Sequence, residues 1–87
     1  MSVINFVKGK WYKLTSNSSK EIFYLKFYRD NNGKFWASEY ISSSRYCDQE
    51  GWLSINGYRI ENVSFGEIKK YLPDGHKDLK RSNINNI

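Results

Sequence analysis

The clearest pattern along the chain is an alternation of apolar and polar residues in two neighbouring segments. Residues 22–29 alternate with a period of two, and residues 34–42 return to the same period after Asp30-Asn-Asn-Gly33. A period of two is typical of β-strands. Asn-Gly between two such runs favours a tight type I′ turn. These two segments are therefore predicted to form a β-hairpin.

Two registers are open for this hairpin. A two-residue turn would place Lys26 opposite Glu39, whereas a four-residue loop would place Phe27 opposite Trp36. The registers differ by two residues, so both put the same side chains on each face. One face, which we expect to form the core, holds Phe23, Leu25, Phe27, Trp36 and Tyr40. The other face holds Tyr24, Lys26, Tyr28, Phe35 and Glu39.

Further short segments have strand character. Residues 1–7 and 9–16 are predicted to be strands, and residues 51–55 and 58–61 flank a second Asn-Gly and predict a second hairpin. Residues 42–50 are polar and are expected to form a loop. Four or five strands joined by tight turns predict a mainly β fold, a small antiparallel meander or an SH3-like, half-open barrel.

Helix signals occur only near the carboxyl end. Ser64-Phe-Gly-Glu67 has the form of a capping box, and Pro73 is expected to end the helix. We expect this short helix to plug one open end of the sheet, and Leu72–Gly75 to form a type I turn. Residues 1–79 are predicted to form a single domain, and residues 80–87, which lack a period, are predicted to be a frayed tail.

Length and composition narrow the class of protein. The chain has 87 residues, which suffices for one hydrophobic core, and aromatic residues make up 17% of it, which supplies bulk for that core. The single cysteine, Cys47, cannot form an intramolecular disulfide, and the sequence contains no apolar run long enough to cross a membrane. We therefore expect a cytoplasmic protein with no membrane partner.

The sequence offers little material for catalysis. His76 is its one histidine, and no nucleophile elbow or phosphate-cradling glycine-rich loop accompanies it. We expect no enzyme activity and no cofactor. Asp74, His76 and Asp78 lie within five residues and could ligate a metal, but the interpretation that we favour places Asp74 in a turn and His76 against the sheet, with no metal.

Basic and aromatic residues are interleaved along the predicted strands, and the formal net charge is +5. Small barrels that bind single-stranded nucleic acid stack bases on aromatic rings while lysines contact phosphates. An anionic nucleotide would suit the same surface. The residues predicted to form this ligand-binding surface are Lys10, Tyr12, Lys13, Tyr24, Lys26, Tyr28, Arg45 and Arg59.

The segment Tyr71-Leu-Pro-Asp-Gly-His-Lys-Asp78 resembles a carboxyl-terminal signature of small, mostly uncharacterised proteins encoded by tailed bacteriophages. Gly9–Tyr12 and Gly33–Tyr40 also resemble that group, so the similarity spans most of the chain. The resemblance implies a phage protein in the host cytoplasm that binds and disables a host or defence component, either a protein or a nucleotide signal. A single-stranded nucleic-acid-binding protein and a minor virion protein are the alternatives, and a homo-oligomer is open.

Overall fold

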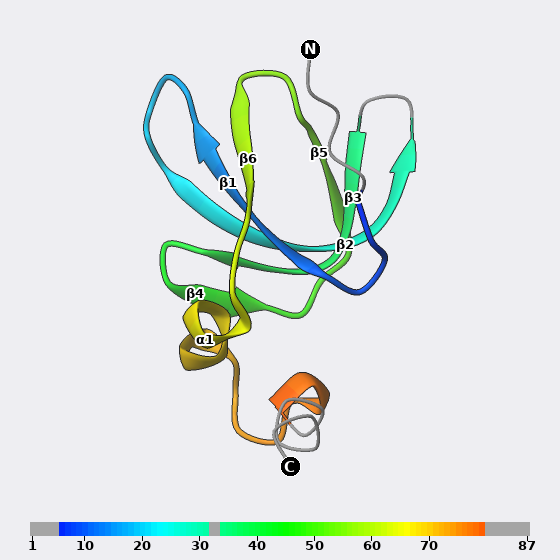
Figure 1. Ribbon diagram of the computed structural model, residues 1–87, viewed down its shortest axis with the longest axis vertical. Helices are drawn as coiled ribbons and strands as arrows, with labels where there is room; N and C mark the ends of the chain where they lie inside the picture. The colour runs from blue at the N-terminus through cyan, green and yellow to red at the C-terminus, as the bar shows by residue number, and fades with distance from the viewer. Residues whose placement is uncertain (1–5, 32–33, 80–87) are drawn as a thin grey trace.

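The computed structural model describes residues 6–31 and 34–79, and it has the mainly β architecture that the sequence predicts (Figure 1). Of the predicted first strand at residues 1–7, residues 1–5 lie outside the described residues, and residues 6–7 are not in a strand. The hairpin tip at 32–33 and the predicted tail at 80–87 also lie outside the described residues. The strands are β1 (Trp11–Ser16), β2 (Ile22–Asn31), β3 (Lys34–Ser42), β4 (Arg45–Cys47), β5 (Gly51–Ser54) and β6 (Tyr58–Asn62). They are followed by the helical turns α1 (Phe65–Ile68) and η1 (Lys69–Tyr71), and by another helical turn at residues 77–79.

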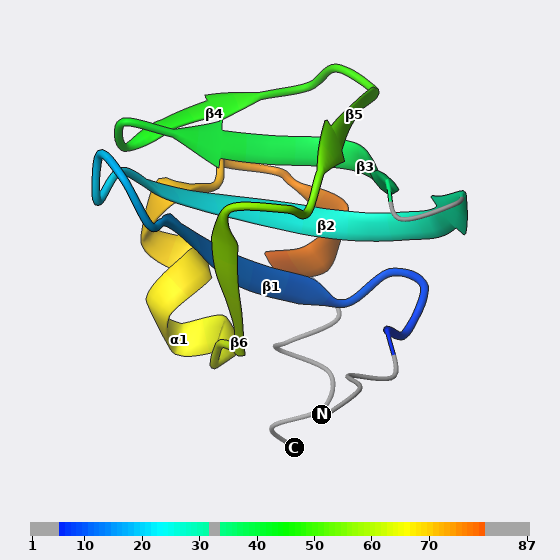
Figure 2. The same ribbon diagram turned by 90° about the horizontal axis from the view of Figure 1, so that it is seen from above.

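The strands form one antiparallel sheet in the order β4-β3-β2-β1-β6. β5 pairs with the other half of β3, beyond the half that pairs with β4. The sheet is strongly bent, so that β5 and β6 rise from its two sides, while α1 and the carboxyl-terminal turn lie beneath it (Figures 1 and 2). Both faces of the sheet are therefore partly covered.

Each face of the sheet carries its own hydrophobic cluster. The inner core lies on the concave face and consists of Tyr12, Leu14, Leu25, Phe27, Phe35 and Ala37. The outer core lies on the opposite face, under α1 and the residues that follow it, and consists of Trp11, Tyr24, Ile41, Ile68 and Leu72. The prediction that the helix plugs an open end is wrong, because Ile68 packs on the outer face of the sheet instead.

The hairpin of β2 and β3 has the register of a two-residue turn, with Lys26 opposite Glu39. Two irregularities interrupt it, because Phe27 pairs with Ala37 and leaves Tyr28 and Ser38 without partners in the ladder. A bulge turns the following residues toward the other face. The predicted core face is therefore wrong beyond the bulges: Phe35 joins the inner core, and Trp36 points outward.

Two other local predictions are corrected by the structure. Among the described residues β5 and β6 do not pair with each other, although the chain does turn at Asn56-Gly57, because β5 joins β3 and β6 joins β1 at opposite sides of the sheet. Residues 42–50 contain β4 as well as loop. Ser43 and Ser44 both have positive φ, 52° and 65°, which is the backbone of a type I′ turn and folds β4 back onto β3.

The helical segment begins and ends where the sequence predicts. α1 starts after Ser64, and η1 ends at Tyr71, before Pro73. The capping box does not form, because the Ser64 side chain makes no capping hydrogen bond and Glu67 is engaged elsewhere. The turn that follows runs one residue later than predicted, from the Pro73 carbonyl to the His76 amide, with Gly75 at positive φ. This turn directs His76 back toward the sheet.

Candidate functional site

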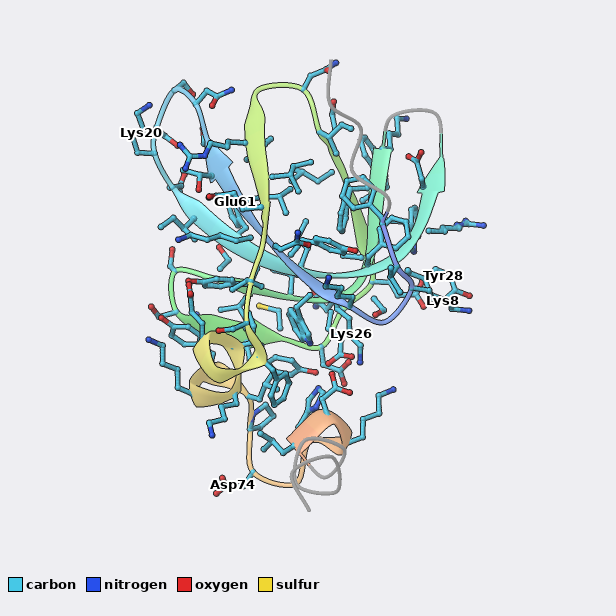
Figure 3. All side chains as sticks on the ribbon, viewed as in Figure 1. Lys8, Lys20, Lys26, Tyr28, Glu61 and Asp74 are labelled. Atoms are coloured by element: carbon cyan, nitrogen blue, oxygen red, sulfur yellow. The ribbon has the colours of Figure 1, made fainter. Side chains whose placement is uncertain are left out.

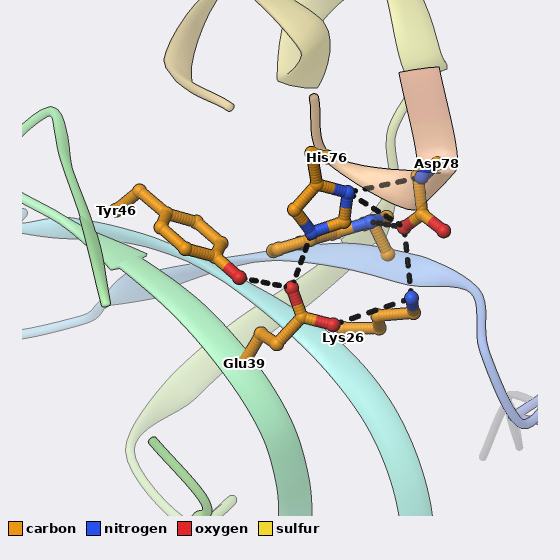
Figure 4. A network of polar contacts seen from close by, with 6 residues as sticks. Lys26, Glu39, Tyr46, His76 and Asp78 are labelled. Carbon is orange, nitrogen blue, oxygen red and sulfur yellow. Dashed lines mark hydrogen bonds and ion pairs between the residues drawn. The ribbon is translucent and has the colours of Figure 1, made fainter. Parts of the chain in front are cut away.

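Six polar side chains form a cluster between the outer face of the sheet and the carboxyl-terminal turn (Figure 4). We call it the buried polar cluster, and its members are Trp11, Lys26, Glu39, Tyr46, His76 and Asp78. Trp11, Lys26, Glu39 and Tyr46 come from β1 to β4, whereas His76 and Asp78 come from the segment after η1. The cluster therefore fastens that segment to the sheet.

Lys26 lies at the centre of the cluster and is only 6% exposed. Its Nζ donates to Asp78 Oδ2 at 2.8 Å and lies 3.3 Å from Glu39 Oε2. The Trp11 indole N–H also donates to Asp78 Oδ2, at 3.2 Å. A buried ammonium group is costly unless it is paired and hydrogen-bonded, and here two carboxylates compensate it.

The hydrogen-bond partners of the His76 ring indicate which of its two nitrogens carries the proton. The Asp78 backbone N–H donates to His76 Nδ1 at 3.0 Å, so this nitrogen carries no proton. The proton is on Nε2, which donates to Glu39 Oε1 at 2.5 Å. His76 is thus neutral in this arrangement, and the interpretation that it packs against the sheet is confirmed. The charges of Lys26, Glu39 and Asp78 sum to an excess of one negative charge.

The carboxyl groups of the cluster have shifted pKa values. Burial by itself would raise the pKa of Glu39, but hydrogen bonds from Tyr46 and His76 and the charge of Lys26 outweigh it and lower that pKa. Burial by itself would also raise the pKa of Asp78, but the hydrogen bonds from Lys26 and Trp11 outweigh it and lower that pKa. For Tyr46, burial and its hydrogen bond to Glu39 raise the phenol pKa. All three shifts favour the protonation states described above.

The eight predicted ligand-binding residues do not share one surface. Tyr12 is completely buried, and Tyr24 and Lys26 are buried under α1 and the carboxyl-terminal turn. The exposed members Arg45 and Arg59 lie on β4 and β6, at opposite ends of the strand order. The remaining three are the exposed Lys10 and Tyr28 and the half-buried Lys13, which lies 3.9 Å from Glu67.

A different set of basic and aromatic residues does come together. Arg29, Trp36 and Trp52 lie directly opposite one another across β2, β3 and β5. Phe35 and Leu53, the next residues along these strands, pack in or against the inner core, so this row lies on the outer face. Trp52 is 55% exposed, which is unusual for so large an apolar side chain. We call Arg29, Lys34, Trp36 and Trp52 the aromatic–basic face.

Each ring of this face is accompanied by a cation. The Arg29 guanidinium lies 5.3 Å from the centre of the Trp36 ring, and Lys34 Nζ lies 4.3 Å from that of Trp52. The Trp36 indole N–H donates to Glu50 at 3.3 Å, which fixes the orientation of that ring. Exposed cation–π pairs of this kind stabilise by only about 0.5–1 kcal/mol. Both rings and both cations thus remain able to contact a ligand.

A cavity adjoins the aromatic–basic face at the two bulges. It has a volume of about 490 Å³, and we call it the lysine pocket; it is lined by Lys8, Gly9, Lys26, Phe27, Tyr28, Ser38, Lys77 and Asp78. Lys8 Nζ lies 4.7 Å from the centre of the Tyr28 ring. Figure 3 shows Lys8 and Tyr28 side by side, with Lys26 nearby and Lys20 on the opposite side of the view.

Sequence reasoning missed most of this arrangement. It included Tyr28 and Lys26 among the ligand-binding residues but not Arg29, Lys34, Trp36 or Trp52. The bulges at Tyr28 and Ser38 turn Trp36 outward, and neither position has a glycine that would have marked a bulge. The partner of Lys26 could be found, since the two-residue turn already places Glu39 opposite it.

Comparison with known proteins adds no further information, because no protein-family model, no curated protein and no solved structure matches the chain. In the described part of the chain, histidine, cysteine, aspartate and glutamate side chains form no group of three or more that could hold a metal ion. None of the described helices has both the length and the apolar character that a membrane crossing requires. The site must therefore be interpreted from its own chemistry.

Proposed function

We propose that the protein is an accessory protein that binds a nucleotide-based component of a host or of its defence through the aromatic–basic face. The single observation that supports this is the row of Arg29, Trp36 and Trp52 across three strands, with Lys34 beside it. Nucleobases stack on exposed aromatic rings, and arginine and lysine contact the phosphates. A nucleotide signal and a single strand of nucleic acid share this chemistry.

The charge of the molecule and of this face favours this ligand class over a protein partner. The net charge of +5 attracts a polyanion from any direction. The centres of protein–protein interfaces are depleted of lysine, whereas here Lys34 accompanies the ring of Trp52. Stacking of one base contributes about 1–3 kcal/mol, so two rings together with two cations suffice for measurable binding.

The test is to titrate the protein at low salt with ATP and, separately, with a twelve-nucleotide oligothymidylate. Tryptophan fluorescence reports the binding. We expect quenching, because Trp52 is exposed. Trp52→Ala should weaken binding by about 5- to 150-fold, the equivalent of one lost stacking contact. Ile22→Ala is the matched control, because Ile22 is also an exposed apolar residue of the sheet but lies at the far end of β2.

The two probes separate the two sources of the ligand. Saturable binding of ATP alone indicates a nucleotide signal, and much tighter binding of the oligonucleotide indicates a nucleic-acid strand. If neither probe binds at low salt, or if Trp52→Ala binds as well as the parent protein, the proposed function is wrong. A protein partner that is captured independently of Trp52 would support that conclusion.

A further inference from the structure

The lysine pocket contains both basic and acidic side chains, at different depths, whereas the charged members of the aromatic–basic face are all basic. Lys8 and Lys77 are both exposed, and they come from segments that are far apart in the sequence. Lys26 and Asp78 are buried and belong to the buried polar cluster. The pocket is therefore basic at its rim and has a carboxylate in its floor.

This division determines how an anionic ligand would lie. The floor cluster has one negative charge in excess, since Lys26 is shared by Glu39 and Asp78 and His76 is neutral. A phosphate is repelled by that floor and attracted by Lys8 and Lys77 at the rim. A group that donates hydrogen bonds is favoured at the floor, where Asp78 Oδ1 receives no hydrogen bond from any described residue.

The Tyr28 ring provides the third element of the pocket. It is 40% exposed, and the bulge at Tyr28 directs it away from the inner core. Lys8 Nζ lies over this ring, so a planar ring and a cation are presented together. The volume of about 490 Å³ falls within the range of small-molecule pockets, roughly 300–1,000 Å³.

We infer that the lysine pocket is a subsite for a single nucleotide whose base carries an exocyclic amino group. The base stacks on Tyr28 with its amino group toward Asp78, and the phosphate lies between Lys8 and Lys77. The inference rests on the proposed function, because it takes the ligand to be nucleotide-based. It goes further in naming the base chemistry and a second binding position next to the tryptophans.

The experiment compares AMP with two analogues by isothermal titration calorimetry. Purine riboside 5′-monophosphate lacks only the 6-amino group, and adenosine lacks only the phosphate. A hydrogen bond to a charged group corresponds to about 10- to 150-fold in affinity, so AMP should bind at least about tenfold more tightly than the first analogue. Adenosine should also bind more weakly than AMP. The ratio of the two affinities should be smaller in Lys77→Gln, because this variant lacks one of the two lysines that attract the phosphate.

Variants connect the effect to the pocket. Tyr28→Ala should weaken AMP binding by about fivefold or more, whereas Lys20→Gln, which removes a lysine on the other side of the molecule, should leave it unchanged. The far-ultraviolet circular dichroism of each variant checks that it folds. Equal affinities for AMP and purine riboside monophosphate, or AMP binding unaffected by Tyr28→Ala, would overturn the inference.

The two proposals can fail separately. Binding of oligothymidylate that depends on Trp52 would sustain the proposed function even if AMP shows no preference, since thymine carries no amino group. In that outcome only the lysine-pocket subsite is wrong. Absence of binding by all probes would reject both proposals.

Discussion

Lys26 is buried between two carboxylates, with its Nζ 2.8 Å from Asp78 Oδ2 and 3.3 Å from Glu39 Oε2. Pairs of this kind do not necessarily stabilise a protein relative to an apolar core. Removal of one partner is nevertheless costly, because the remaining buried charges lose their compensation. In this cluster Glu39 and Asp78 would then repel each other.

We therefore expect Lys26→Met to lower the free energy of unfolding by about 3–5 kcal/mol in urea denaturation. Lys13→Met is the control, because Lys13 lies 3.9 Å from Glu67 and both side chains are partly exposed. It should cost less than about 1 kcal/mol. Equal losses of unfolding free energy in the two variants would show that the buried polar cluster contributes no more to stability than a partly exposed ion pair.

The lowered pKa values of Glu39 and Asp78 make stability depend on pH. A carboxyl whose pKa is lower in the folded state contributes stability that is fully present above its ordinary pKa, 4.5 for Glu39 and 3.8 for Asp78, and that is lost as the pH falls through the folded values. The free energy of unfolding should thus decrease as the pH falls below about 5. In Glu39→Gln this decrease should be smaller, and an identical pH profile would contradict the assignment.

At the scale of single elements, the two bulges decide which residues face the inner core. Tyr28 and Ser38 each add one residue to a strand, and together they restore the register of the hairpin tip. If Ser38 continued the regular alternation instead of forming a bulge, Phe35 and Trp36 would exchange faces. The aromatic–basic face exists because this exchange does not occur.

Deletion of Ser38 should therefore keep Phe35 in the inner core, because it removes only the extra residue and leaves the neighbouring pairs of the ladder in place. We expect the deletion to cost much less than Phe35→Ala, for which the loss of a buried phenylalanine costs about 3–5 kcal/mol. Urea denaturation of the two variants measures this, and equal losses in the two would contradict it.

The hairpin shows which structural details a sequence can predict. The alternating pattern and Asn32-Gly33 were sufficient for the strands, and they left two registers open, of which the structure has the one that pairs Lys26 with Glu39. The bulges were not predictable, because nothing in the side chains of Tyr28 and Ser38 distinguishes them from regular strand residues. Likewise, Ser43-Ser44 lacks the Asn and Gly that would have marked the type I′ turn before β4.

At the scale of the whole molecule, the sequence predicted the fold class but only part of the candidate site. Strands could be recognised locally, and mainly β architecture follows from them. Burial of Tyr12, Tyr24 and Lys26 depends instead on how α1 and the carboxyl-terminal turn pack across the sheet. Long-range packing of this kind leaves no local pattern, so interleaved basic and aromatic residues were assigned to a surface that the fold covers.

Binding of a nucleic-acid strand by the aromatic–basic face and the lysine pocket should depend on salt. Arg29, Lys34, Lys8 and Lys77 could contact up to four phosphates, so log Kd against log salt should have a slope of about 3 for a single strand. Arg29→Gln combined with Lys34→Gln should lower the slope by about 1.4. Lys20→Gln should leave the slope unchanged, and a salt-independent affinity would exclude phosphate contacts.

The contact between Lys26 and Asp78 spans 52 positions of the chain. During synthesis, the lysine leaves the ribosome long before the aspartate that neutralises it has been translated. Until then the hairpin of β2 and β3 can form, but its lysine must stay hydrated and its outer face uncovered. Completion of the native structure is thus tied to the emergence of the last described residues, and a ribosome stalled before Asp78 would hold a sheet without its cover.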